Sequence, residues 1–363
     1  MGEVAQEFKS GNFLKADEID IAGDYPVYGG NGLRGYTSTY NHDGEFALIG
    51  RQGALCGNMN YSVGKAYFTE HAVVVEADEN NDTRFLYCML DIMNLGQYSD
   101  QSAQPGLAVN KLIKLENFFP QKEEQQQIGW YFNTLDRLIT LHQRKYDEMK
   151  TLKKYMLQKM FPQNGPKIPK IRFEGFTGEW EQRKLGNVLK FQNGFNGSKE
   201  RYGTGTKLIS VMDILNDDFI TYESIRGLAD VTEEEKERFS VDFGDVLFQR
   251  SSENVEDAGR TNVYLDRKRA VFGGFVIRGK KNSDYQPEFM RYVLDTKMIR
   301  KQITTKAQGA QHINVSQETL QDVLFCLPSK EEQIRIGNYF RNLDNLITLH
   351  QRKCNELKNI KKF

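Results

Sequence analysis

The sequence contains one segment of 36 residues twice. Residues Pro120–Tyr155 read PQKEEQQQIGWYFNTLDRLITLHQRKYDEMKTLKKY, and residues Pro328–Phe363 read PSKEEQIRIGNYFRNLDNLITLHQRKCNELKNIKKF. The copies lie 328 − 120 = 208 residues apart, and 23 of the 36 positions are identical without a gap. Shared composition alone does not produce this identity. The chain therefore consists of two similar halves that each end in the repeated segment.

The repeated segment has the pattern of a long helix. Each copy opens with Pro and a Lys-Glu-Glu-Gln turn, which places carboxylates near the positive end of the helix dipole, and neither has an internal proline. Apolar or near-apolar residues then recur in alternating steps of four and three, as in the seam of a coiled coil. The seam residues are Ile128, Phe132, Leu135, Ile139 and His142 in the first copy and Ile336, Phe340, Leu343, Ile347 and His350 in the second.

Such a seam needs a partner helix, and the other copy can supply it. The intervening residues give the chain enough length to turn back, so we predict an antiparallel pair within one chain. A parallel coiled coil between two chains is the alternative. At about 1.5 Å per residue, a helix of about 37 residues is about 55 Å long, which makes each helix a rod. We expect His142 and His350 to set the register rather than bind a metal.

Length and composition limit the possible classes of protein. A chain of 363 residues suits two domains plus connectors. Since no apolar run approaches the roughly 18 residues of a membrane span and the start lacks a signal segment, we expect a cytoplasmic protein without membrane contact. The four cysteines lack the spacing of zinc ligands and are predicted to be reduced thiols.

The net charge of zero conceals a segregation of charge. Residues 1–119 carry 8 Lys and Arg against 16 Asp and Glu, whereas residues 120–172 carry 11 against 5 and residues 328–363 carry 8 against 4. The repeated segments are therefore basic, but charge alone leaves DNA binding undecided.

The remainder of the sequence predicts two β-rich domains and an α+β fold. Short β-type runs alternate with glycine-rich turns, as in Phe46–Ile49 and Ala72–Val75, and a helix is expected near Thr83–Leu95. In the second half we expect strands at 207–212, 245–249 and 270–277 and a helix at 287–301. The predicted division is domain 1 at 1–119, helix at 120–160, a proline-containing linker at 161–175, domain 2 at 176–327 and helix at 328–363.

Polar residues in the turns of each domain are candidates for contact with a nucleic acid. Four glycines in Tyr28–Tyr36 let the backbone approach a ligand, to which Asn31 and Arg34 can offer donors; a purely structural turn is the alternative. Arg51 and Gln52 follow a strand and carry the forked groups that match guanine and adenine edges.

The second domain repeats this plan with different residues. Its glycine-rich turn, 192–197, carries Asn193 and Asn196, and Arg250 follows a strand as Arg51 does. Gln104 and Gln308 occupy similar positions shortly before the two long helices. Two similar domains with different turn residues favour the recognition of two different targets. The alternative is an old duplication whose loops have since diverged.

No catalytic or metal-binding constellation is present in the sequence. It lacks an Asn-Pro-Pro-aromatic motif, Gly64-Lys65 is not a phosphate loop because Ala66 follows, and the histidines form no H-E-x-x-H pair. Sites can assemble from distant residues, so two other classes stay open: a DNA-modifying enzyme with an unrecognised active site, and a coiled-coil adaptor without DNA contact.

Three motifs together resemble the specificity (S) subunit of type I restriction-modification systems over nearly the whole chain. They are the Pro-x-x-Glu-Glu-Gln openings, Leu-Asp-x-Leu-Ile-Thr-Leu-His-Gln-Arg-Lys in both copies, and Arg-Phe-x-x-Phe-x-x-x-Trp-x-x-Arg-Lys-Leu-Gly at 172–186. We call residues 172–186 the lead-in segment. The first half departs from the family pattern, because Met1–Val4 matches Leu185–Val188 and no lead-in stands before it in the given sequence. A genuine short variant and a truncated start are the two alternatives. We expect a pseudo-cyclic arrangement with the two termini close together.

The resemblance implies a non-catalytic reader of double-stranded DNA. Two target recognition domains would each bind half of a bipartite, asymmetric site, with an intramolecular coiled coil fixing the gap. The helices would dock two modification (M) subunits, which bind S-adenosylmethionine and methylate adenine. Restriction (R) subunits would supply cleavage driven by ATP and Mg. The chain itself is then expected to need no cofactor.

Overall fold

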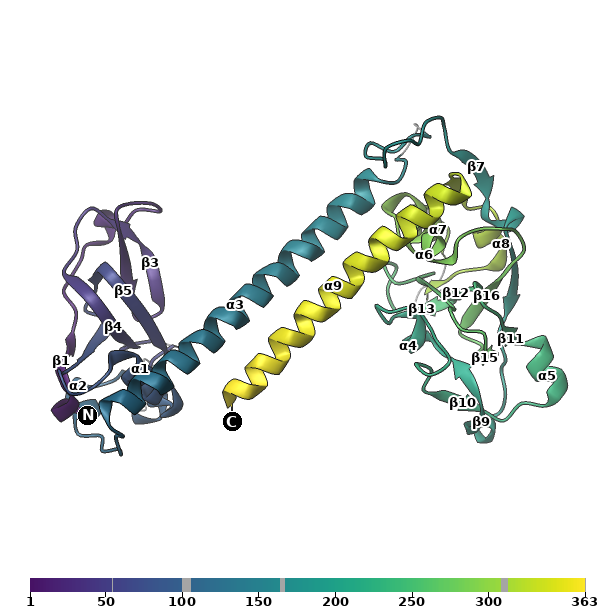
Figure 1. Cartoon of the computed structure of the whole chain (residues 1–363). Coiled ribbons are helices and arrows are strands. Elements are labelled where there is room, and N and C mark those ends of the chain that lie inside the picture. The colour runs from purple at the N-terminus through teal and green to yellow at the C-terminus, as the bar shows by residue number, and fades with distance from the viewer. Residues whose placement is uncertain (54, 100–105, 164–166, 308–312, 363) are drawn as a thin grey trace. The chain divides into compact units, whose positions relative to one another are not determined.

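The computed structural model describes residues 1–53, 55–99, 106–163, 167–307 and 313–362. The chain forms two compact units: the first unit is residues 1–141 with 354–363, and the second unit is residues 142–353. The fold is α+β, as predicted, and its elements are labelled in Figure 1. Because the units divide within the long helices, the predicted domain limits stay a prediction.

Both copies of the repeated segment are single helices, α3 (Lys122–Lys159) and α9 (Lys330–Lys362). Each helix begins two residues after its proline and has two glutamates in the first turn. The predicted seam residues alternate with exposed positions. Leu135, Ile336, Phe340 and Leu343 are buried, and Ile128, Phe132, Ile139, His142, Ile347 and His350 are half-buried.

The two long helices contact each other within each unit, in opposite directions. In the second unit, Lys153 pairs with Asp344 at 2.5 Å, and Nδ1 of His142 lies 3.0 Å from Nδ1 of His350. In the first unit, Nζ of Lys361 donates hydrogen bonds of 2.7 and 3.0 Å to Asp136. In the second unit the residue number falls along α3 as it rises along α9, which is the predicted antiparallel direction. The coiled coil itself stays a prediction.

The first unit is built on a six-stranded sheet of order β1-β6-β4-β5-β2-β3. Successive residues of β4 point to opposite faces: Ala47 and Ile49 belong to the cluster under α1, whereas Phe46 and Leu48 pack with Phe68 on the other face. The elements are β1 (Ala5–Ser10), β2 (Tyr25–Gly29), β3 (Gly32–Thr37), β4 (His42–Gly50), β5 (Met59–Phe68), β6 (Ala72–Ala77), α1 (Thr83–Ile92) and α2 (Val109–Ile113).

The second unit repeats the topology of the first. Its sheet β14-β12-β16-β8 matches β5-β4-β6-β1, and the parallel pair β9 and β15 matches the parallel pair β2 and β5. The strands are β7 (Glu181–Lys184), β8 (Leu189–Asn193), β9 (Tyr202–Ile209), β10 (Gly227–Ala229), β11 (Ser240–Val241), β12 (Val246–Gln249), β13 (Ser251–Ser252), β14 (Thr261–Val263), β15 (Ala270–Phe272), β16 (Val276–Lys281), β17 (Ile313–Asn314) and β18 (Leu324–Leu327). The helices are α4 (Val211–Ile214), α5 (Glu233–Arg238), α6 (Pro287–Leu294), α7 (Lys297–Lys306) and α8 (Gln317–Gln321).

Three predicted elements of the second unit have different limits. The strand predicted at 270–277 is two strands, β15 and β16, because the backbone turns at Gly273–Phe275. The strand predicted at 207–212 ends at Ile209, where Ser210 and Asp213 form a capping box that starts α4. The helix predicted at 287–301 is interrupted between α6 and α7 at residues 295 and 296. A glycine pair interrupts the first of these elements, and short polar segments interrupt the other two.

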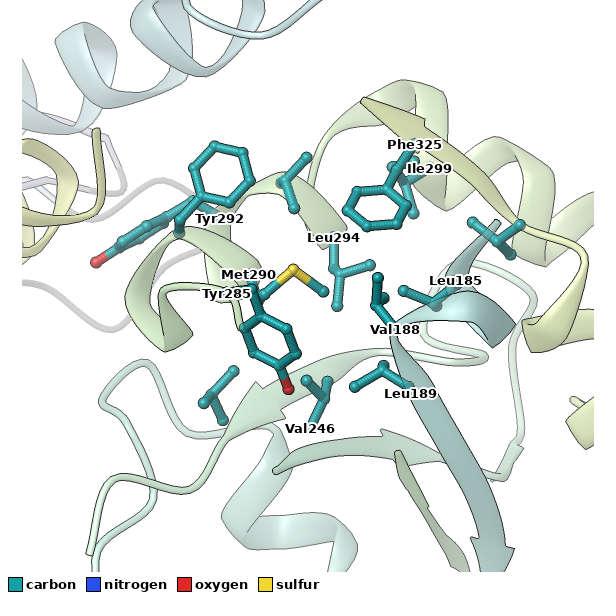
Figure 2. Packing of buried hydrophobic residues seen from close by; sticks show 14 of the residues in the cluster. Leu185, Val188, Leu189, Val246, Tyr285, Met290, Tyr292, Leu294, Ile299 and Phe325 are labelled. Carbon is teal, nitrogen blue, oxygen red and sulfur yellow. The ribbon is translucent and has the colours of Figure 1, made fainter. Parts of the chain in front are cut away.

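The main core of the second unit lies between α6 and the sheet. Figure 2 shows Met290 and Leu294 of α6 packed against Val188, Leu189 and Val246 from the sheet side. All five side chains are at most 1 % exposed, which removes a large apolar area from water. This core fixes the position of the strands whose ends carry the candidate residues.

The same hydrogen bonds join each long helix to its unit. Nε2 of Gln125 donates to the carbonyl of Pro120, and its Oε1 accepts from the backbone N–H of Asp82, the N-cap of α1. Gln333 makes the equivalent bonds to Pro328 and to Gln286, the N-cap of α6. The repeated glutamine is therefore a joint between the long helix and the helix that covers the sheet.

Candidate nucleic-acid interface

Asn31 and Arg34 lie on the hairpin between β2 and β3. The turn residues are Gly30 and Asn31, and Gly32 follows with a φ of +91°, a conformation that favours glycine. Asn31 and Arg34 are both exposed. A Cβ added to Gly29 would lie 2.6 Å from Cδ of Arg34, so the arginine side chain lies across the hairpin. The glycine-rich segment is thus a hairpin with two exposed polar side chains.

Arg51 and Gln52 follow the carboxyl end of β4. The backbone N–H of Arg51 donates to the carbonyl of His71 at 2.9 Å, and its Nη1 donates to Oγ of Ser10 at 3.1 Å. Arg51 therefore ties together the ends of β1 and β4 and the turn between β5 and β6. Gln52 is exposed.

The structure brings the hairpin and the end of β4 together. A Cβ added to Gly30 would lie 3.1 Å from the carbonyl oxygen of His71 and 3.4 Å from that of Gln52. Because the backbones approach so closely, Asn31 and Gln52 belong to one surface. We call Asn31, Arg34, Arg51, Gln52 and His71 the first tip.

Arg250 occupies the same place in the second unit. It follows β12, its backbone N–H donates to the carbonyl of Phe275 at 2.9 Å, and its Nη1 donates to the carbonyl of Gly274 at 3.3 Å. A Cβ added to Gly274 would lie 3.3 Å from Cβ of Asn196. Arg250 and Asn196 therefore flank one turn and are both exposed. We call Asn193, Asn196, Arg250 and Phe275 the second tip.

The glycine-rich turn of the second unit does not correspond to the hairpin of the first unit. Gly194 follows β8 and corresponds to Gly11, which follows β1. An added Cβ would lie 2.1 Å from the carbonyl oxygen of Gly273 in one case and 2.3 Å from that of Phe68 in the other. The next residues, Phe195 and Asn12, each form a parallel bridge to the turn opposite. The sequence signal for this pairing is a single glycine after the first strand.

Arg278 fixes the start of the glycine-rich turn of the second unit, residues 192–197. Its Nη2 donates to Oε1 of Gln192 at 2.6 Å, and its Nη1 donates to the carbonyl of Ser240. Burial lowers the pKa of Arg278 and raises the pKa of the nearby Asp245. Both side chains are buried. Arg278 positions Gln192, whereas the carboxylate of Asp245 accepts hydrogen bonds from the backbone N–H groups of Asp242 and Lys281.

The sequence reasoning missed an apolar part of the second tip. Phe275 and Met212 are 69 % and 77 % exposed, and they line a cavity of about 310 Å³ beside Asn196 and Tyr202. Exposed apolar side chains of this kind can contact the methyl group of thymine. Neither residue stands out in the sequence, because each sits among ordinary strand or helix formers. Gln104 and Gln308 lie outside the described residues.

Two features of other protein classes are absent from the described part of the chain. There, no three His, Cys, Asp or Glu side chains are grouped so that they could hold a metal ion. Among the same residues, no helix is long and apolar enough to cross a membrane.

Comparisons with known proteins give the family. Residues 1–151 and 177–359 match the family model described as "Type I restriction modification DNA specificity domain". The chain is 44 % identical over 142 residues to the type I restriction enzyme EcoprrI specificity subunit of Escherichia coli, which covers 38 % of this chain and 35 % of that protein. It is 21 % identical over 252 residues to the MjaVIII specificity subunit of Methanocaldococcus jannaschii, covering 67 % and 58 %. The matches thus span about a third to just over half of these relatives.

A solved structure has the same fold. The S subunit of a type I restriction-modification system from M. genitalium superimposes with a TM-score of 0.67 and 15 % identity, covering 99 % of this chain and 92 % of that one. The family match covers both tips and most of each copy of the repeat. The chain belongs to the family of type I restriction-modification DNA specificity proteins.

Proposed function

We propose that this chain reads a bipartite, asymmetric DNA sequence for a type I restriction-modification complex, with each tip reading one half. The observation that carries the proposal is the shared placement of Arg51 and Arg250. Each arginine follows the equivalent strand and is fixed by the same backbone hydrogen bond, yet its neighbours differ. Two equivalent backbone arrangements that carry different side chains suit the recognition of two different half-sites.

The residues of the tips suit base recognition. Arginine can bind guanine through two hydrogen bonds and asparagine can bind adenine in the same way, each worth about 1–3 kcal/mol of discrimination. The second tip adds the exposed Phe275, which can contact thymine. We infer that the tips enter the major groove, where base pairs present distinct patterns of donors and acceptors.

We further propose that α3 and α9 act as the spacer. Their 38 and 33 residues correspond to about 57 and 50 Å at about 1.5 Å per residue. Half-sites about one helical turn apart, roughly 34 Å, lie on one face of DNA. An antiparallel pair of this length is long enough to set such a distance.

We assign the methylation and cleavage reactions to partner subunits. The proposal has two M subunits docked on the helices and carrying S-adenosylmethionine, and R subunits carrying ATP and Mg, while this chain is non-catalytic and has no cofactor of its own. The first domain has 16 acidic against 8 basic residues, so M subunits would provide much of the contact with phosphates.

Exchange of one domain tests the two-reader proposal. Residues 176–327 are replaced by the corresponding domain of another family member, and the methylated motif is determined by sequencing genomic DNA. We expect one half of the motif to change and the other half to stay. A change in both halves would contradict independent readers. The unmodified chain with the same partners is the control.

An insertion tests the spacer. Four helix-forming residues placed after Lys159 lengthen α3 by about 6 Å, which corresponds to one or two base pairs at about 3.4 Å each. We expect the gap in the methylated motif to grow by that amount while both halves stay the same. An unchanged gap contradicts the spacer role. Methyl transfer by the purified chain alone would support an enzyme instead, and absence of DNA binding with partners present would support an adaptor.

A further inference from the structure

The two tips share a backbone arrangement that equates their residues one by one. In each unit, five equivalent backbone hydrogen bonds join the end of the first strand, the arginine and the turn between two strands. The donor and acceptor residues are Gly11 and Ala72, Asn12 and Phe68, Arg51 and His71, Ala72 and Thr69, and Thr69 and Tyr28 in the first unit, and Gly194 and Val276, Phe195 and Phe272, Arg250 and Phe275, Val276 and Gly273, and Gly273 and Ile209 in the second. The turns at 69–71 and 273–275 therefore correspond residue by residue.

Three positions in this arrangement carry side chains of different chemistry in the two units. The first position lies two residues after the glycine that follows the first strand. The second is the turn residue whose carbonyl accepts from the arginine, and the third lies three residues after Tyr28 or Ile209. The pairs of residues at these positions are Phe13 and Asn196, His71 and Phe275, and Asn31 and Met212. Phe13 is 70 % exposed, and Phe275 and Met212 are exposed as well. The first tip therefore has an apolar side chain at the first position, and the second tip has one at each of the other two.

Strand pairing places the first and third positions on opposite sides of the turn. In the first unit the turn joins β5 to β6. The first position follows β1, which pairs with β6, and the third follows β2, which pairs with β5. In the second unit β8 pairs with β16 and β9 pairs with β15 in the same way. The apolar side chain thus lies on one side of the turn in the first unit, whereas the two of the second unit lie on the turn and on its other side.

The apolar side chains of the second tip are fixed in position. Met212 lies on α4, and Nδ2 of the buried Asn262 is 2.8–3.4 Å from the carbonyl oxygens of residues 213, 214, 216 and 218. These contacts hold α4 and the loop after it. Phe275 is fixed through its carbonyl, which accepts from Arg250, and both apolar side chains line the cavity of about 310 Å³ beside Asn196. An apolar pocket that is formed before binding reduces the entropy cost of filling it.

Phe13 is fixed through the backbone and leaves its ring exposed. Its carbonyl accepts a hydrogen bond of 3.0 Å from Oη of Tyr67. The preceding residue, Asn12, forms a parallel bridge to Thr69 in the turn that carries His71. Phe13 therefore gives the first tip an exposed apolar side chain next to this turn.

We propose that each tip contacts the C5 methyl group of a thymine, through Phe13 in the first half of the DNA site and through Phe275 with Met212 in the second half. Among the four unmodified bases, thymine alone presents an apolar group in the major groove. The proposal rests on the proposed function and adds to it a base and the residue Phe13. Because the apolar side chains lie on different sides of the turn, the methyl contact has a different place relative to the arginine in each tip. The two tips then read different half-sites although their backbones are equivalent.

Replacement of thymine by uracil tests the proposal, because uracil lacks only the C5 methyl group. Each thymine of the methylated motif is replaced in turn, and binding of the complex with its modification partners is measured by competition. We expect one replacement in each half to weaken binding about three- to tenfold. Phe13→Ala should abolish this dependence in the first half only, and Phe275→Ala in the second half only, while Met212→Ala should reduce it in the second half. Val63→Ala and Phe243→Ala, which remove exposed apolar side chains elsewhere in the two units, should leave both dependences unchanged.

An exchange of side chains tests the placement of the methyl contact. The double variant Phe13→Asn with His71→Phe gives the first tip the side chains that the second tip has at the first two positions. We expect the methyl dependence of the first half to move to a different base pair. Uracil in the gap between the halves is the DNA control and should have no effect.

Three outcomes would overturn the proposal. One is a half-site in which no thymine depends on its methyl group. Another is a dependence of unchanged size in both Phe13→Ala and Phe275→Ala when circular dichroism shows the variants folded. In either case, retained preference for the motif leaves the proposed function intact, so the two failures are distinguishable. Absence of any preference for the motif would overturn both.

Discussion

Arg172 and Glu332 form a buried ion pair that joins the lead-in segment to the first turn of α9. Nε and Nη2 of Arg172 each donate a hydrogen bond of 2.7 Å to one oxygen of the carboxylate. Nη1 donates to the carbonyl of Gly178 at 2.6 Å, so the arginine also fixes the path of the lead-in. The side chain of Glu332 is 0 % exposed. Loss of one partner would leave a charge in the interior without its counter-charge.

Arg172→Ala and Glu332→Ala should each lower the free energy of unfolding of the second unit by about 3–5 kcal/mol. Urea denaturation followed by circular dichroism measures the change. Glu124→Ala is the matched control, because Glu124 occupies the same position in the first copy and is exposed. Its effect should stay within about 0.5 kcal/mol. Equal losses from Glu124→Ala and Glu332→Ala would show that burial of the ion pair is not the cause.

Gln125→Ala and Gln333→Ala should each cost about 1–3 kcal/mol, because each leaves the N–H of a helix N-cap without its acceptor. The two glutamines are 1 % and 2 % exposed and make the same pair of bonds in their units. Hydrogen exchange at the amides of Asp82 and Gln286 reports each joint separately. Gln127→Ala, an exposed position on α3, serves as the control. An unchanged exchange rate of the Asp82 amide in Gln125→Ala would show that the hydrogen bond from Asp82 to Gln125 does not hold α1 against α3.

The long helices could be predicted from the sequence because their signals are local and repeated. A proline start, acidic first turn and steps of three and four all lie within one segment, and α3 and α9 begin within two residues of the predicted starts. The short strands β15 and β16 could not be separated, since Gly273 and Gly274 lie inside an otherwise apolar run. A turn of this kind depends on packing against Gly194, which is distant in the sequence.

The residues of the two tips could likewise be predicted from the sequence only in part. Arg51 and Arg250 could be proposed because each follows a recognisable strand, and the structure places them equivalently. Their neighbours His71 and Phe275 could not be proposed from the sequence. Each lies on a turn that comes close to the arginine only because two strands pair, β4 with β6 in the first unit and β12 with β16 in the second. The equivalence of Gly11 and Gly194 likewise depends on strand order rather than on any shared motif.

Acidification should weaken the helix pair at His142 and His350. Burial lowers the pKa of His350 below the ordinary value of 6.5, and His142 and Lys145 lower it further. The unfolded chain therefore binds the proton more readily, so stability is unaffected above about pH 7 and falls as the pH drops through 6.5. Because the ring is half exposed, we expect a fall in Tm of under about 4 °C.

His350→Gln should flatten this pH dependence, because glutamine keeps a polar group at the position without a titrating one. Thermal denaturation at several values between about pH 5 and pH 8 measures it. His71→Gln is the control, since His71 lies at the first tip and not between the helices. An equally steep pH dependence in His350→Gln would place the titrating group elsewhere.

Arg250→Ala and Arg51→Ala should each relax sequence preference in a different half of the DNA site. If each guanidinium reads a base edge, its loss should reduce discrimination at one position by about 1–3 kcal/mol, which is about 5- to 150-fold. Binding of the complex with its modification partners to a library of half-site variants measures the preference. Arg144→Ala, which removes an exposed arginine on α3 paired with Glu148, should leave both halves unchanged. A uniform loss of affinity across all sequences would identify a phosphate contact, and loss in the same half for both variants would contradict separate readers.

For Arg51, Ser10→Ala distinguishes the two roles of the side chain, because it removes the acceptor at 3.1 Å while keeping the guanidinium. If Ser10→Ala alone relaxes the same base, the hydrogen bond between β1 and Arg51 orients the arginine for recognition.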